Sequence, residues 1–156
     1  MAVTLGHVDE STIRAGYQDA LGLSEAQADQ FMAQIWDWYC GMLDERLFEW
    51  DVSLAGARVG ILSNSADGAR REEERRYAFS TVFDPVLYSH EIHLAKPDPA
   101  VFAETCERLG CAPAEILLID DLAPNVDAAR AYGLKALLHR STPDTIAAAE
   151  SILQTS

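Results

Sequence analysis

The sequence predicts an α/β protein built on a parallel, doubly wound sheet. Four apolar runs of strand length alternate with segments that show helical periodicity, and the connections between them are short. The run at 116–119 is apolar throughout, as expected for a strand that is covered on both faces. Such alternation predicts parallel strands joined by right-handed crossovers. The predicted strands are residues 58–62, 86–88, 116–119 and 135–139.

The first 50 residues are predicted to be mainly helical. Apolar residues recur there at helical spacing, glycines end the runs, and Ser24 with Gln27 forms a capping-box pattern. An aromatic stripe at Phe31, Trp36 and Tyr39 is interpreted as helix packing rather than a ligand site. The predicted helices are residues 9–21, 25–40 and 43–50.

Helices also separate and follow the predicted strands. Asp98 is the expected N-cap of one and Thr142 of another. The helix at 67–77 is highly charged, with Arg70/Glu74 and Glu72/Arg76 spaced i,i+4, and is interpreted as a solvated face without function. The predicted ranges are 67–77, 99–109, 125–132 and 143–153.

Composition places limits on the partners. The 156 residues include 25 acidic and 12 basic side chains, for a formal charge of −13. This charge argues against nucleic acid or an anionic membrane as a partner, because phosphate contacts require Lys and Arg. No apolar run approaches membrane-spanning length and no signal-peptide pattern is present, so a cytoplasmic location is expected. The three cysteines have no metal-binding spacing.

Polar residues gather at one predicted edge of the sheet. Ser63-Asn64 follows one strand, Asp120-Asp121 follows another, and Lys96 precedes a helix. Ligands of open α/β sheets bind at the carboxyl ends of strands. Carboxylates suit Mg²⁺, and a lysine can balance an anionic substrate. Taken singly, each group could instead be a turn, capping or solvated loop residue.

Three motifs in this order resemble the haloacid dehalogenase-like hydrolase superfamily, which is mostly magnesium-dependent phosphatases. The matching stretches are GILSNS, Lys-Pro-Asp-Pro from Lys96, and LLIDDLAPN. The resemblance implies that Ser63, Asn64, Lys96 and Asn125 contact the substrate, with Ser63 and Lys96 in the catalytic set. It also implies that Asp121 is a metal ligand with Asp120 beside it. The implied fold is one domain over 1–156, a three-layer core at about 51–156 with a small helical cap at about 8–50.

One family motif is missing from the sequence. The family begins with a strand that ends in Asp-x-Asp and supplies the nucleophile, whereas Met1–Val8 contains no carboxylate. Asp9 is predicted to be a helix N-cap instead. We therefore expect weak or absent Mg²⁺ binding and little activity. The vacant strand position is expected to be filled by pairing of strands 58–62 and 116–119, by insertion of Ala2–Leu5, or by a homodimer.

The sequence favours a phosphatase-type hydrolase that acts on a small phosphorylated or anionic molecule and is impaired by the missing motif. Two alternatives stay open: an inactive binding or assembly module of the same fold, and a dehalogenase-type hydrolase. The acidic pair at Asp120 and Asp121 favours the phosphatase, because metal-independent dehalogenation requires no magnesium site.

Overall fold

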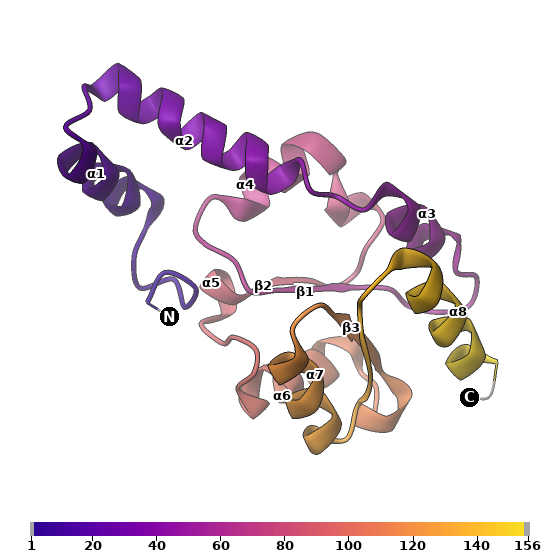
Figure 1. Cartoon of the computed structure of the whole chain (residues 1–156). Helices are drawn as coiled ribbons and strands as arrows, with labels where there is room; N and C mark the ends of the chain where they lie inside the picture. The colour runs from indigo at the N-terminus through magenta and orange to yellow at the C-terminus, as the bar shows by residue number, and fades with distance from the viewer. Residues whose placement is uncertain (1, 155–156) are drawn as a thin grey trace. The chain divides into compact units, whose positions relative to one another are not determined.

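The computed structural model describes residues 2–154 of the chain (Figure 1). These residues form two compact units. The first unit contains the chain up to Leu43 together with Gly60–His93, and the second contains Asp44–Val59 and the chain from Leu94 onward. None of the helices in this described range is both long and apolar enough to cross a membrane.

The first unit joins a helical hairpin to a short parallel strand pair. Strands β1 and β2 pair in parallel, with Ile61 opposite Val86 and Ser63 opposite Tyr88. Helix α2 contacts α4, and α1 contacts α2. In chain order the elements are α1 (Glu10–Leu21), α2 (Glu25–Cys40), β1 (Ile61–Ser63), α4 (Ala69–Tyr77), the 3₁₀ turn η1 (Phe79–Thr81), β2 (Val86–Tyr88) and α5 (Ser89–Ile92).

The second unit contains the other parallel pair. Strand β3 pairs with β4, with Leu117 opposite Lys135 and Asp120 opposite Leu138. Helix α7 contacts both of these strands, and α3 contacts α8. The elements are α3 (Glu45–Ser53), α6 (Pro99–Leu109), the 3₁₀ turn η2 (Pro113–Glu115), β3 (Leu117–Asp120), α7 (Ala123–Tyr132), β4 (Lys135–Leu138) and α8 (Thr142–Leu153).

The four predicted strands are present and parallel, but they form two two-stranded sheets within residues 2–154. The expected pairing of β1 with β3 is therefore wrong, and so is the expected insertion of Ala2–Leu5, because those residues form turns. Apolar runs identify strands but do not say which strands are neighbours, and that explains the difference. The homodimer stays a prediction.

Most helix starts follow their predicted caps. The Asp9 side chain accepts a hydrogen bond from the Thr12 N–H, and Asp98 caps α6 in the same way. The capping box of Ser24 is also confirmed. The predicted Thr142 cap is wrong, because the Ser141 hydroxyl accepts from the backbone of Asp144 and the helix begins one residue earlier.

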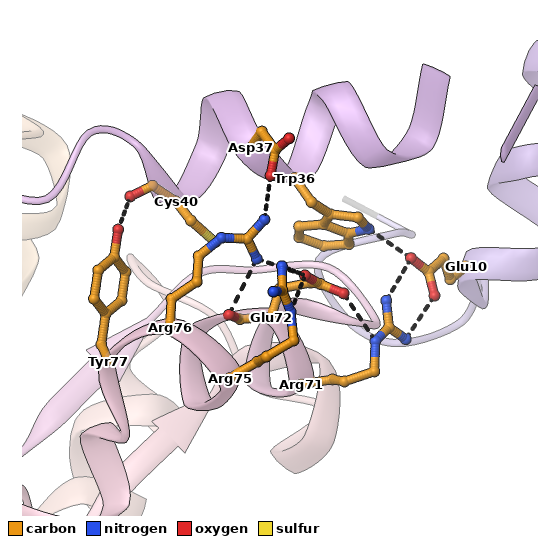
Figure 2. Close-up of polar contacts among 9 residues, drawn as sticks. All are labelled: Glu10, Trp36, Asp37, Cys40, Arg71, Glu72, Arg75, Arg76 and Tyr77. Carbon is orange, nitrogen blue, oxygen red and sulfur yellow. Dashed lines mark hydrogen bonds and ion pairs between the residues drawn. The ribbon is translucent and has the colours of Figure 1, made fainter. Parts of the chain in front are cut away.

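Helix α4 is a contact surface as well as a charged helix (Figure 2). Arg71 forms an ion pair with Glu10 of α1, and Arg76 forms one with Asp37 of α2. The Glu72–Arg76 pair within the helix is confirmed, whereas Arg70 donates to Glu91 instead of Glu74. The charge run thus ties α4 to the helical hairpin and to α5, which periodicity alone did not indicate. Each exposed pair is worth little by itself.

The start of α4 requires glycine. Gly68 has φ +96°, and a Cβ at this position would lie 2.8 Å from Cζ2 of the Trp36 indole. Gly68→Ala is expected to lower the free energy of unfolding by at least about 1–2 kcal/mol, because a left-handed backbone disfavours a Cβ. Urea denaturation measures this.

Gly16→Ala is the matched control for that substitution. Gly16 lies within α1, and a Cβ there meets nothing within 4 Å. This change should stabilise the protein by about 0.5–1 kcal/mol, because alanine is the better helix former. Equal effects of the two substitutions would contradict the strain assigned to Gly68.

Candidate functional site

A buried ion pair lies at the carboxyl end of β3. The Lys96 Nζ donates to Asp120 Oδ2 at 2.7 Å, and the two side chains are only 9% and 4% exposed. Asp120 is the last residue of β3, whereas Lys96 lies in the loop before α6. A charge this deeply buried needs a partner, so each group holds the other in place. The lysine is therefore not a solvated loop residue.

The second oxygen of Asp120 is also occupied. Asp120 Oδ1 accepts from the Leu122 N–H and from Asn125 Nδ2, both at 2.9 Å. Asn125 is buried in the first turn of α7, the same turn that contains Pro124, which favours the helix start at Ala123. The structure therefore brings together Lys96, Asp120 and Asn125, three of the residues that the sequence singled out.

Asp121 differs from Asp120 in its surroundings. Its side chain is exposed, and within residues 2–154 the structure assigns its carboxylate no ion-pair partner. The alternation of side chains near a strand end explains the split, because one carboxylate turns inward and the next outward. Asp121 is thus the carboxylate of the pair that is available to a cation.

The donor set fits a magnesium ion only in part. Asp121 offers carboxylate oxygen, which Mg²⁺ prefers, but both oxygens of Asp120 already accept hydrogen bonds. The described residues contain no group of three His, Cys, Asp or Glu side chains placed to hold a metal. A near-octahedral shell around Asp121 would consist mostly of water.

Ser63 and Asn64 belong to the first unit. Ser63 is the last residue of β1, is half-buried, and lies opposite Tyr88 of β2 in the strand register. Asn64 follows it and is exposed. Both residues lie at the carboxyl end of β1, as the sequence predicts.

The two histidines near α5, His90 and His93, have different partners. His90 Nδ1 hydrogen-bonds to Ser65 Oγ at 3.0 Å in a buried position. His93 instead contacts the Leu5 carbonyl oxygen and stacks on His7. Burial lowers the pKa of His90, which favours its neutral ring. The His93 contacts fasten the N-terminal turns to the end of α5.

Sequence reasoning missed a partly buried polar contact in the first unit. Glu73 of α4 accepts a hydrogen bond from the phenol of Tyr88. Burial raises the pKa of Glu73, and burial together with this carboxylate raises the pKa of Tyr39 to about 12. Tyr39 was assigned to an aromatic packing stripe and Glu73 to a solvated charge run. No local pattern in the sequence distinguishes these two from their neighbours.

Comparison with known families matches a large part of the chain. The family described as haloacid dehalogenase-like hydrolase matches residues 51–138. A phosphatase of Mycobacterium tuberculosis is 37% identical over 84 residues, which are 53% of this chain and 39% of that protein. The phosphoglycolate phosphatase of Thiobacillus denitrificans is 43% identical over 78 residues, 50% of this chain and 34% of that protein.

A dehalogenase and an enzyme of known structure are also similar to this chain. The (S)-2-haloacid dehalogenase 4A of Burkholderia cepacia is 29% identical over 53% of this chain and 36% of its own length. The chain therefore matches well under half of the length of these three relatives. A Bacteroides thetaiotaomicron enzyme of the same family, solved with magnesium and inorganic phosphate, superposes with a TM-score of 0.75. It is 19% identical, and the superposition covers 89% of this chain and 74% of that one, which shows the shared fold.

Proposed function

The chain belongs to the haloacid dehalogenase-like hydrolases, and we propose that within this family it is of the phosphatase type. Its ligand is a small phosphorylated or otherwise anionic molecule. Ser63, Asn64, Lys96 and Asn125 contact this ligand, and Asp121 binds the metal with Asp120 as its structural neighbour. Relatives named as phosphatases support this choice.

The buried Lys96–Asp120 pair is the observation that carries the proposal. An ammonium that is removed from water and held by a carboxylate has a fixed position, so it can stabilise an anion without reorganising first. Asn125 and the Leu122 N–H hold the carboxylate itself in place. A merely structural ion pair would not require an exposed second carboxylate beside it, yet Asp121 stands there.

The metal in this proposal is Mg²⁺, and it binds weakly to the chain by itself. Asp121 supplies a single carboxylate, and Asp120 is committed to its three donors. When bound, the ion would neutralise charge on a phosphoryl group. With water in most ligand positions, we expect affinity on the order of millimolar.

Turnover by the 156-residue chain, tested by itself, is proposed to be negligible. Its sequence contains no Asp-x-Asp, and Asp9 is a helix N-cap. Asp120 is held in an ion pair with Lys96, and a carboxylate that is paired in this way is a poor nucleophile. Loss of a nucleophile from a cooperating set commonly lowers the rate by about 10⁴- to 10⁶-fold.

Two other functions are alternatives to the phosphatase. A dehalogenase-type hydrolase is favoured by the similarity to a haloacid dehalogenase, although at lower identity than the phosphatases. A non-catalytic binding or assembly module is favoured by the absence of Asp-x-Asp from the sequence.

We also propose a cytoplasmic location and a single domain with a helical cap at about 8–50. The net charge of −13 supports a partner other than nucleic acid or an anionic membrane.

The test combines binding with turnover. Inorganic phosphate is titrated in the presence of Mg²⁺ and followed by ³¹P NMR, and hydrolysis of p-nitrophenyl phosphate is measured in the same buffer. We expect phosphate binding in the millimolar range, weakened several-fold in Asp121→Asn, together with hydrolysis at the level of the uncatalysed reaction.

Asp127→Asn is the matched control, because Asp127 is also exposed and lies on α7, the helix that follows Asp121. It should leave phosphate binding unchanged. Robust hydrolysis that Asp121→Asn abolishes would show that the chain does hold a nucleophile. Equal effects of the two Asp→Asn variants would show that Asp121 has no special role in binding.

A further inference from the structure

An exposed arginine lies just beyond the carboxyl end of β4, the strand that pairs with β3. The register places Leu138 opposite Asp120, and the His139 N–H donates to the Asp120 carbonyl oxygen at 2.8 Å. Arg140 is the next residue in the chain. Neighbouring parallel strands lie about 4.8 Å apart, so the backbone of Arg140 is close to that of Asp121. Arg140 therefore stands beside the candidate site and in the same unit.

The Arg140 side chain differs from most basic side chains of this chain. Nine of the 12 basic side chains contact an acidic side chain or a backbone carbonyl oxygen within residues 2–154. Arg140 is exposed, and in the same described range the structure assigns its guanidinium neither a hydrogen bond nor an ion pair. Its charge is thus available to a ligand, although the chain has a net charge of −13.

The carboxylates that follow or adjoin Arg140 in the fold have other donors. Asp144 Oδ2 accepts from the hydroxyl of Ser141, the N-cap of α8. Asp44, the N-cap of α3, accepts from the Thr142 hydroxyl. Both acids therefore support helix starts, and this explains why an exposed arginine near them is left without an ion pair.

We propose that Arg140 is a specificity residue that binds a carboxylate of the ligand, so that the substrate is a small phosphorylated carboxylic acid. This inference rests on the proposed function, in which Lys96 contacts the ligand and Asp121 binds the metal. A guanidinium is planar and presents two parallel N–H donors, which match the two oxygens of a carboxylate. Given the strand spacing, one or two carbon atoms between phosphate and carboxylate are enough for the ligand to reach both places.

The experiment compares two esters of similar size, 2-phosphoglycolate and ethyl phosphate, in which a carboxylate replaces a methyl group. Both are titrated into the full chain in the presence of Mg²⁺ and followed by ³¹P NMR. The unsubstituted chain should bind 2-phosphoglycolate about 3- to 10-fold more tightly, a modest gain because Arg140 is exposed.

Arg140→Gln should remove this preference, and it should change the affinity for ethyl phosphate much less, because that ester has no second anionic group. Arg140→Lys should retain only part of the preference, since it keeps the charge but loses the planar pair of donors. Urea denaturation should be unchanged in both variants, because the side chain is exposed and its removal breaks no assigned contact within residues 2–154.

Arg46→Gln is the matched control. Arg46 is exposed on α3 of the same unit, and its guanidinium is likewise assigned no partner in the described part of the chain. This variant loses the same charge and should keep the preference for 2-phosphoglycolate. Equal losses in Arg46→Gln and Arg140→Gln would reveal a general charge effect and overturn the inference.

The two esters also separate this inference from the proposed function. Equal affinity of the unsubstituted chain for both esters would overturn the role of Arg140 and leave the phosphate site intact. If neither ester binds, the proposed function is wrong and the inference is wrong with it.

Discussion

Asp120→Ala is expected to lower the free energy of unfolding by about 3–5 kcal/mol, because it leaves a buried ammonium without its partner. The Lys96 side chain is only 9% exposed, and water cannot readily replace the carboxylate. The Leu122 N–H and the Asn125 amide lose the same acceptor. Urea denaturation monitored by tryptophan fluorescence measures this loss.

The double variant Lys96→Met with Asp120→Leu separates charge burial from packing. Removing both charges together should recover much of the stability, because a buried ion pair is often replaced by apolar groups at little net loss. If Asp120→Ala alone changes the unfolding free energy by less than about 1 kcal/mol, the pair behaves as an exposed one and the site is more hydrated than its burial indicates.

Phe102→Ala is expected to destabilise the protein by about 3–5 kcal/mol through the cavity that it leaves. Phe102 lies on α6, is completely buried, and packs near the ring of Tyr132 with 5.9 Å between the centroids. Helix α6 contacts α7, the helix that carries Asn125, so the same cavity should also loosen the support of Asp120.

Leu153→Ala serves as the control for this cavity, since Leu153 lies at the end of α8 and is 37% exposed. It should change the unfolding free energy by about 0.5 kcal/mol or less. Comparable losses from the two substitutions would mean that Phe102 does not lie in a well-packed interior.

The strand and helix types could be predicted from local patterns because those patterns act over a few residues. Apolar runs marked all four strands, and Asp9, Ser24 and Asp98 marked helix starts through caps that the structure confirms. Boundaries were less certain, as the Ser141 cap shows, because two adjacent hydroxyl residues could both serve.

The candidate site was predictable to the extent that its residues follow strand ends. Order and spacing singled out Lys96 and Asp120, the family resemblance implied Asn125, and the structure brings these three together. Spacing could not say which of the two adjacent carboxylates is buried. That depends on the direction of each side chain at the end of β3, which the helix and loop around it decide.

The sequence by itself determined the family, the alternation of parallel strands and helices, and the acidic pair, since these depend on residue order and short-range periodicity. Only the tertiary structure decided that the strands pair as β1–β2 and β3–β4 and that the charged helix α4 holds α1 and α2. It likewise decided that Tyr88 and Glu73, 15 positions apart in the printed numbering, are joined by a hydrogen bond. Long-range pairing depends on complementary surfaces that the folded chain creates, and no local pattern encodes them.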